Sequence, residues 1–151
     1  PVSTILIEGL DLAGKSTLVR ELSKSLRDRG IAARVCSNSL CANNPIHAFT
    51  EPLRGDPRFG SLEGNCLMLA AHIWDARNFV PQADGIHVQD SCWLQSAAYE
   101  GEFGSPDTDA VWVDCPQIRF DRALFLTASM PARLRRLRAY QQNHWRLEDP
   151  V

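Results

Sequence analysis

The chain has 151 residues, 44% of them apolar and 23% charged, and its formal net charge is −2. This length suits one domain with a substantial core, so residues 1–151 are expected to form a single domain. The charge gives no electrostatic basis for bulk binding to nucleic acid, and no apolar run approaches the roughly 18 residues that a membrane span requires.

Cysteine usage and the first residues favour a cytoplasmic protein. The five cysteines are odd in number and form no C-x-x-C pair, which is typical of reduced thiols rather than of a disulfide framework. The start of the sequence lacks the basic, apolar and small-residue sections of a secretory signal. We therefore expect a cytoplasmic location, with neither nucleic acid nor a membrane as partner.

The beginning of the chain contains the phosphate-binding pattern G-x-x-x-x-G-K-S/T, with Gly9, Gly14, Lys15 and Ser16 at the diagnostic positions. Glycines let the backbone curl so that successive N–H groups point into one anion-sized hollow. Lys15 is expected to reach the β- and γ-phosphates of a nucleotide, and the Ser16 hydroxyl is expected to hold Mg²⁺. The pattern predicts binding of a nucleoside triphosphate.

The sequence on either side of this loop supports the prediction. Residues 3–7 form a short β-branched run that predicts a buried strand. After the loop, Leu18, Val19 and Leu22 recur at helical spacing, and Gly30 suits the end of that helix. Strand, glycine loop and helix thus come one after another in the order that a phosphate-binding loop requires.

Further strands and helices alternate along the rest of the chain. Strands are predicted over residues 31–36, 85–90 and 120–127, and helices over residues 62–79, over 91–99 and from Pro131 onward. Residues 37–60 have loop chemistry with a short helical turn around His47, and residues 111–113 suit either a strand or a helix. The broad apolar surface of the helix over 62–79 suggests that it packs deep beside the sheet. Alternating elements predict a mostly parallel sheet covered on both faces.

Two aspartates are candidates for the chemistry. Asp90 ends a predicted strand, where a carboxylate suits a magnesium-bound water or an acceptor hydroxyl; the alternative is a helix N-cap. Asp11 lies inside the phosphate-binding loop, where its charge would repel phosphates. We expect it to contact the acceptor, directly or through Mg²⁺, and the alternative is a solvated loop acid.

The helix after Pro131 carries arginines at positions 133, 135, 136 and 138. A solvated basic face is one interpretation. We favour a lid over residues 131–148 that clamps the transferred phosphate, with Arg136 and Arg138 as its phosphate ligands.

Aromatic residues offer candidate stacking surfaces for a ring of the acceptor. Phe49 lies in a predicted loop beside Glu51 and is the better candidate, while Trp74 suits either stacking or the core. Trp93 is expected in the core.

Together these residues resemble the thymidylate kinase family of P-loop nucleotide kinases. Residues 7–17 are similar to that family's I-E-G-x-D-G-A-G-K-S/T-T loop, including the internal aspartate. Further similarities are Thr50-Glu51-Pro52 to R-E-P, residues 67–73 to L-L-F-A-A-D-R, residues 89–99 to D-R-Y followed by S-x-x-A-Y-Q, and Arg136, Arg138 and residues 146–148 to the lid segment.

The resemblance implies a three-layer α/β/α P-loop domain with a mostly parallel five-stranded sheet, and transfer of the γ-phosphate of ATP to a nucleoside monophosphate with Mg²⁺. A domain of this type normally continues with another helix and strand, so we expect a short, truncated or incomplete chain. A homodimer is a further expectation. The expected ATP ligands are Gly9, Leu12, Ala13, Gly14, Lys15, Ser16, Thr17, Arg136 and Arg138; the acceptor ligands Asp11, Phe49, Glu51, Trp74, Ser91 and Tyr99; the catalytic residues Asp11, Lys15, Asp90 and Arg136; and the Mg²⁺ ligands Ser16 and Asp90.

The chain departs from the family where the acceptor's phosphate would bind. Thr50, Ile73 and Ser91 stand where the family has arginines, and a hydroxyl or alkyl group is a poor replacement for a bidentate arginine–phosphate contact. Three interpretations are open: an acceptor with less negative charge, such as a nucleoside or a small alcohol; a nucleotide acceptor bound by other cations, such as Arg54, Arg58 and Arg77; or a non-catalytic ATP-binding regulator.

Overall fold

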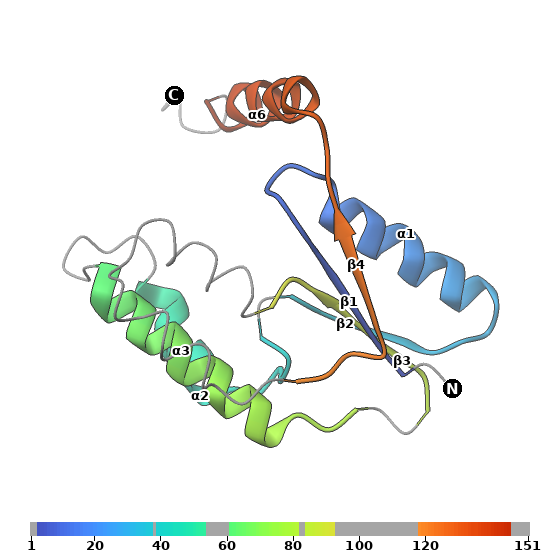
Figure 1. The fold of residues 1–151 in the computed structure, drawn as a ribbon, viewed down its shortest axis with the longest axis vertical. Helices are drawn as coiled ribbons and strands as arrows, with labels where there is room; N and C mark the ends of the chain where they lie inside the picture. Colours follow the sequence, from blue (N-terminus) through green and yellow to red (C-terminus); the bar gives the residue numbers. More distant parts are fainter. Residues whose placement is uncertain (1–2, 38, 54–60, 82–83, 93–117, 146–151) are drawn as a thin grey trace, which may run out of the picture.

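The computed structural model describes residues 3–37, 39–53, 61–81, 84–92 and 118–145. Strands and helices alternate along them (Figure 1). In chain order these are β1 (Thr4–Gly9), α1 (Lys15–Asp28), β2 (Ala33–Ser37), α2 (Pro45–Thr50), the 3₁₀ turn η1 (Glu51–Leu53), α3 (Ser61–Asn78), β3 (Ile86–Asp90), β4 (Arg122–Leu126) and α6 (Met130–Trp145).

The sheet is parallel, with the strand order β2-β3-β1-β4. Ile7 of β1 and Ser37 of β2 both pair with Asp90 at the end of β3. Since the strands are parallel, their carboxyl ends share one edge, where ligands bind in open α/β sheets. The described residues supply four of the five expected strands.

The core lies where α1 packs on the sheet. Ile7, Val19 and Val88 are buried at its centre, and full burial of such a side chain stabilises the fold by about 1.5–3 kcal/mol. Partly buried neighbours surround them, including Leu18 and Leu22 of α1. In Figure 1, α1 lies on one side of the strands and the α2–α3 pair on the other, which gives the expected α/β/α arrangement.

Helix α3 does not pack deep beside the sheet, contrary to expectation. It packs mainly against α2, and its buried face is partly polar. The fully buried carboxylate of Asp75 accepts hydrogen bonds from the Leu40 backbone N–H at 2.7 Å and from Asn44 Nδ2 at 2.9 Å. This carboxylate fixes the segment after β2 to the helix. Near its end α3 meets the sheet through an edge-on contact between Phe79 and His87, with ring centroids 4.9 Å apart.

Asp121 fastens the beginning of β4 to the beginning of β1. Its Oδ2 accepts hydrogen bonds from the backbone N–H and the hydroxyl of both Ser3 and Thr4, at 2.9–3.0 Å. Hydrogen bonds from the Ser3 backbone, from the two hydroxyls and from the Thr4 backbone lower the pKa of Asp121 to about 2. These bonds fix the register of the edge strand of the described sheet.

Most predicted elements are confirmed to within two residues at each end, and the helical turn around His47 is the whole of α2. The predicted helix over 91–99 (beyond residue 92), Trp93 and residues 111–113 lie outside the described residues. Within the described ranges, every helix is too short or too polar to cross a bilayer.

Candidate functional site

Two glycines give the loop between β1 and α1 its shape. Gly9 has a φ of 143°, and a Cβ at this position would overlap the carbonyl oxygen of Leu126 in β4. Gly14 has a φ of 109° and precedes the first residue of α1. Both positions therefore require glycine, for backbone conformation and, at Gly9, also for space.

The N-terminus of α1 opens onto this loop as a site for an anion. In the described structure no side chain caps the helix, and its first turn contains no acidic residue. The first N–H groups of a helix have no partner within the helix, and the helix dipole makes this end positive. A phosphate group is the ligand that such a terminus favours.

Lys15 is folded back over the loop. Its Nζ donates a hydrogen bond to the carbonyl oxygen of Gly9 at 2.7 Å and lies 3.5 Å from Oδ1 of Asp11. The Lys15 side chain is 11% exposed, whereas that of Asp11 is 52% exposed. The ammonium group therefore lies inside the loop while the carboxylate stays at its rim, where it does not occupy the anion site.

A cavity of about 870 Å³ lies in front of the loop, within the size range of small-molecule sites. The phosphate-binding loop and α1 line one side of it, and the ends of β2 and β3 line the other. Its lining residues are Asp11, Leu12, Ala13, Gly14, Lys15, Ser16, Thr17, Leu18, Glu21, Ser37, Asp90, Ser91 and Arg136.

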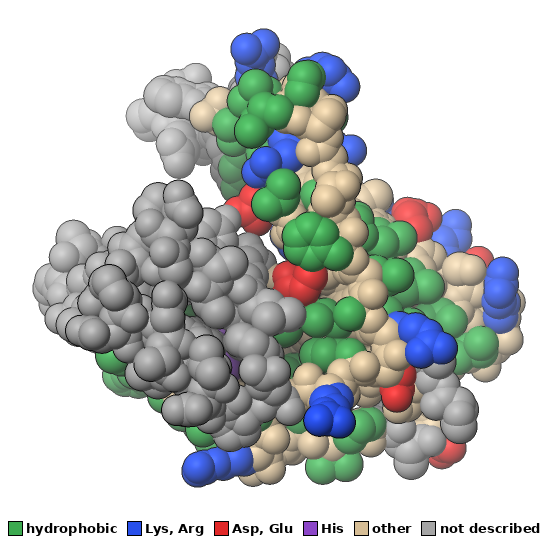
Figure 2. Space-filling view, in the orientation of Figure 1, with side chains coloured by type: hydrophobic (Ala, Val, Ile, Leu, Met, Phe, Trp, Pro, Cys, Tyr) green, Lys and Arg blue, Asp and Glu red, His purple; other side chains and the backbone are tan. Residues whose placement is uncertain are grey.

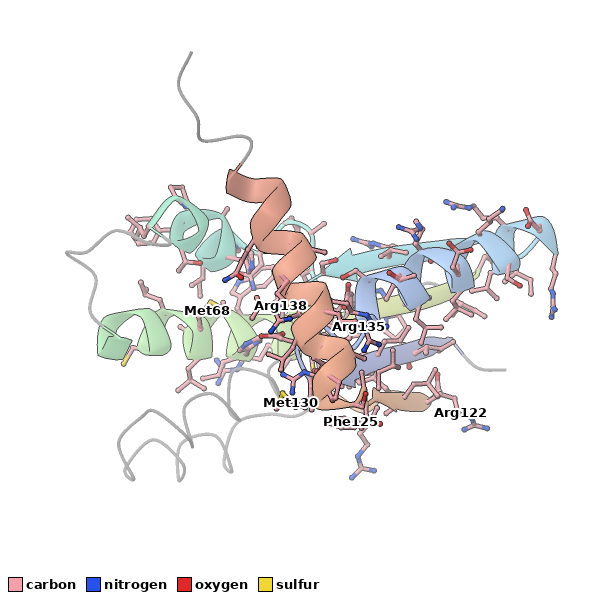
Figure 3. The ribbon with its side chains drawn as sticks, turned by 90° about the horizontal axis from the view of Figure 1, so that it is seen from above. Met68, Arg122, Phe125, Met130, Arg135 and Arg138 are labelled. Carbon is pink, nitrogen blue, oxygen red and sulfur yellow. The ribbon has the colours of Figure 1, made fainter. Side chains whose placement is uncertain are left out.

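Helix α6 contacts the phosphate-binding loop through two arginines, of which Arg136 also lines the cavity. Arg133 donates from Nε to the carbonyl oxygen of Asp11 at 2.8 Å, and Arg136 donates to that of Leu12 at 2.5 Å. Figure 3 looks down on α6, which crosses above the sheet with Arg135 and Arg138 labelled along it. Arg138 is not among the lining residues of the cavity, and helical spacing places it opposite the pair that binds the loop.

Few other contacts hold α6 to the described part of the chain. Met130, Leu134 and Tyr140 are 59%, 44% and 57% exposed, and Figure 2 shows hydrophobic and basic side chains together at this end of the molecule. The two arginine–carbonyl bonds therefore make the main polar connection between α6 and the loop within the described residues. This weak packing suits an element that moves when a ligand binds.

A smaller cavity of about 330 Å³ adjoins the first, because Ser37 lines both. Its described lining residues carry neither a carboxylate nor a lysine or arginine; they are Val35, Cys36, Ser37, Ser39, Cys41, Ala42, Asn44, His47 and Ala48. Burial, followed by the charge of Asp75, raises the pKa of the Cys41 thiol to about 11. The thiol therefore stays neutral, and the polar groups of the described lining are hydroxyls, thiols, an amide and an imidazole.

Some residues of the predicted site line a cavity in the structure and others do not. Those of the loop, together with Asp90, Ser91 and Arg136, surround the larger cavity, and Gly9 lies behind them. Phe49 of α2 is 62% exposed, and neither it nor Trp74 of α3 is among the described lining residues of either cavity. The side chain of Glu51 and the whole of Tyr99 lie outside the part of the chain that the structure describes. Acceptor binding by these four residues stays a prediction.

The sequence reasoning missed Arg133 and Ser37. Arg133 and Arg136 are three residues apart and therefore lie on the same face of a helix, and this spacing could have identified the pair. Ser37 ends β2, and ligands bind at the carboxyl ends of parallel strands.

No protein-family model and no curated protein matches the sequence, but solved structures resemble its fold. A thymidylate kinase from Candida albicans aligns with a TM-score of 0.65 and 19% identity, over 88% of this chain and 66% of that one. A thymidylate kinase from Ehrlichia chaffeensis gives 0.64 and 15%, over 93% and 79%. A deoxyadenosine kinase from M. mycoides gives 0.54 and 19%, over 90% and 70%. The chain therefore has a thymidylate-kinase-like P-loop kinase fold, and it spans about two thirds of the Candida protein.

Proposed function

We propose that the protein is an ATP-dependent phosphotransferase that passes the γ-phosphate of ATP to a nucleotide resembling dTMP. One observation carries the proposal. The phosphate-binding loop and the N-terminus of α1 face Asp90 and Ser91 across a single cavity of about 870 Å³, so a triphosphate and an acceptor group have room to meet between them. The shared fold of nucleotide kinases supports the same reaction class.

In this proposal Lys15 and the N–H groups of the loop bind the triphosphate and offset its charge. Lys15 exchanges its bond to the Gly9 carbonyl for one to a phosphate oxygen. The loop and the ends of β2 and β3 orient the two reactants, and such positioning supplies most of the catalysis in phosphoryl transfer.

Ser16 and Asp90 suit Mg²⁺. They place a hydroxyl and a carboxylate in the same cavity, and Mg²⁺ in nucleotide sites needs only one or two protein oxygens because phosphates and water complete its shell. When bound, the ion supplies positive charge beside the β- and γ-phosphates.

Arg136 is the described lid residue that lines the larger cavity. It lines the cavity while donating to the Leu12 carbonyl, so a rotation of its side chain can move the guanidinium onto a phosphate. Arg133 keeps its bond to Asp11 in that rearrangement and holds α6 in place.

The smaller cavity favours a second candidate, phosphorylation of an uncharged acceptor such as a nucleoside or a small alcohol. Its described lining offers hydroxyl, amide and imidazole groups without a cation, which suits a sugar or a base better than a phosphate. The acceptor is in either case a small molecule, and we propose no nucleic-acid or membrane partner.

An acceptor panel tests both candidates. ADP release from ATP and Mg²⁺ is measured with nucleoside monophosphates, nucleosides and small alcohols, in a coupled assay. Turnover of dTMP above that of thymidine supports the nucleotide acceptor, and the reverse order supports the uncharged one. Release at the level of ATP alone for every acceptor would contradict both and favour a non-catalytic ATP-binding regulator.

A further inference from the structure

Glu8 is a buried acid beside the site that the proposed mechanism does not use. It is the residue before Gly9, with 7% of its surface exposed, and it is not among the lining residues of the larger cavity. Its Oε1 accepts a hydrogen bond from the backbone N–H of Cys92 at 2.7 Å, and its Oε2 accepts one from the Ser91 hydroxyl at 3.0 Å. The carboxylate thus connects the beginning of the phosphate-binding loop to the chain just after β3.

Ser91 has an unfavourable backbone conformation at this connection. Its φ is 65°, in the left-handed region that residues other than glycine seldom occupy. The main chain of Ser91 is fixed from both directions, because its N–H donates to the Ile7 carbonyl at 2.9 Å and its carbonyl accepts from Gln89 Nε2 at 2.8 Å. Such conformations persist where surrounding contacts determine them, and they concentrate at functional sites.

The left-handed turn sets the direction of the chain after β3. Asp90 and Ser91 both line the larger cavity, so the backbone at Ser91 determines how these two residues face the phosphate-binding loop. The carboxylate of Glu8 accepts from the side chain of Ser91 and from the N–H of Cys92, and it therefore holds the strained residue and the one that follows it.

We propose that Glu8 is a positioning residue for phosphoryl transfer: it holds Ser91 in the left-handed conformation and thereby aims Asp90 and Ser91 into the site. This inference rests on the proposed function, since it assigns a role within that reaction. The side chain of Glu8 thus adds to the backbone bond between Ser91 and Ile7 in joining the phosphate-binding loop to the chain after β3.

Glu8→Ala and Glu8→Gln separate positioning from general stability. The alanine removes both hydrogen bonds, whereas the glutamine carbonyl still accepts from Cys92 and its amide still pairs with the Ser91 hydroxyl. We expect Glu8→Ala to lower kcat about 100-fold, as a misplaced reacting group does. The affinity for ATP measured without Mg²⁺ should change less than about twofold, since the loop amides are untouched. Glu8→Gln recovers most of the kcat.

The matched control is Ile5→Ala, which weakens the same strand at a partly buried core position and leaves Ser91 alone. It should lower thermal stability without the selective loss of kcat. If Glu8→Ala fails to fold, Glu8→Asp replaces it, because an aspartate keeps the charge but is too short to reach both donors. A loss of kcat equal to that of Ile5→Ala at matched stability would overturn the proposal.

Ser91→Gly provides the sharper test, because glycine adopts the left-handed conformation without strain. In a Ser91→Gly background, the effect of Glu8→Ala on kcat should shrink from about 100-fold to about threefold or less, since the two residues act as a unit. An unchanged effect in that background would show that Glu8 does not work through Ser91.

Measurements of ATP binding distinguish failure of this inference from failure of the proposed function. If no acceptor is phosphorylated by the wild-type protein, the proposed function fails. The gain in ATP affinity on adding Mg²⁺ is still measurable by calorimetry without an acceptor. Loss of that gain in Glu8→Ala and its retention in Glu8→Gln support the placement of Asp90 by Glu8, and an undiminished gain in Glu8→Ala overturns it.

Discussion

Leu12 shows how single residues set the shape of the phosphate-binding loop. Its φ is 63°, a left-handed conformation at which a side chain is strained, and the thymidylate kinase loop pattern has glycine at this position. The carbonyl of Leu12 accepts the hydrogen bond of Arg136. The strained residue is therefore the one that presents an oxygen to α6.

This conformation makes a prediction about stability. At most positions a protein with Ala is more stable than one with Gly. At a left-handed residue the protein with Gly is the more stable, because a Cβ costs about 1 kcal/mol there. We expect Leu12→Gly to be more stable than Leu12→Ala by about 1 kcal/mol in urea unfolding. At the exposed Lys24 of α1, the Ala variant should be more stable than the Gly variant. A more stable Ala variant at both positions would contradict the left-handed conformation of Leu12.

At the scale of elements, α6 is the piece with the weakest attachment. Its sequence predicts a lid with Arg136 and Arg138 as phosphate ligands. The structure brings Arg133 and Arg136 to the loop, and phosphate binding by Arg138 stays a prediction. Arginine composition could be read from the sequence, but the face that meets the loop depends on how the helix leaves β4. The sequence alone shows only that Arg133 and Arg136 are three residues apart and so lie on one face of the helix.

The attachment of α6 is tested by comparing Arg133→Ala with Arg135→Ala. Both remove one arginine from the same helix, but of the two only Arg133 has a described bond to the loop. We expect Arg133→Ala to raise the KM for ATP about fivefold, consistent with about 1 kcal/mol for an exposed charge-assisted hydrogen bond, and to speed amide exchange over residues 130–145. Equal effects of the two substitutions would argue against the contact.

Helix α3 carries a pH-dependent element. Burial lowers the pKa of His72 from 6.5 to about 4, an effect that Asp75 partly offsets and His47 adds to. The unfolded chain therefore binds the proton first as pH falls, so stability decreases between about pH 6.5 and 4. The shift corresponds to about 3 kcal/mol at most.

We expect His72→Gln to flatten this dependence. Unfolding free energies measured in urea at pH 7, 5.5 and 4.5 should fall less steeply in the variant than in the wild type. Parallel curves for the two proteins would show that His72 is not the group responsible.

Across the whole molecule, much of the fold could be predicted from local patterns. The β1–loop–α1 unit is dictated by fixed spacing and backbone requirements, and the strand that ends at Asp90 is indicated by Ile86 and Val88 after Gly85. The partners of α3 could not be predicted, because its buried face includes the polar His72 and Asp75, which hydropathy assigns to the surface. The role of Glu8 was equally inaccessible, since its donors lie more than 80 residues away in the sequence.

The structure also separates the two halves of the candidate site. The predicted ATP ligands from Leu12 to Thr17 are adjacent in the chain and line the larger cavity, and ATP binding by them stays a prediction. The proposed acceptor side combines the ends of β2 and β3, where Ser37 and Ser91 line the cavity. The acceptor therefore depends on residues that are far apart in the sequence and meet only in the folded protein. The larger cavity favours a nucleotide acceptor and the smaller one an uncharged acceptor, and the acceptor panel compares the two.

The central claim, transfer of a phosphoryl group from a triphosphate held by this loop, is tested most directly by Lys15→Ala against Lys24→Ala. Both substitutions remove a lysine from α1, but only Lys15 lines the cavity. With the best acceptor of the panel, ADP release should fall at least about 100-fold in Lys15→Ala and stay within about twofold of wild type in Lys24→Ala, with circular dichroism unchanged in both. Undiminished ADP release by folded Lys15→Ala would contradict the account.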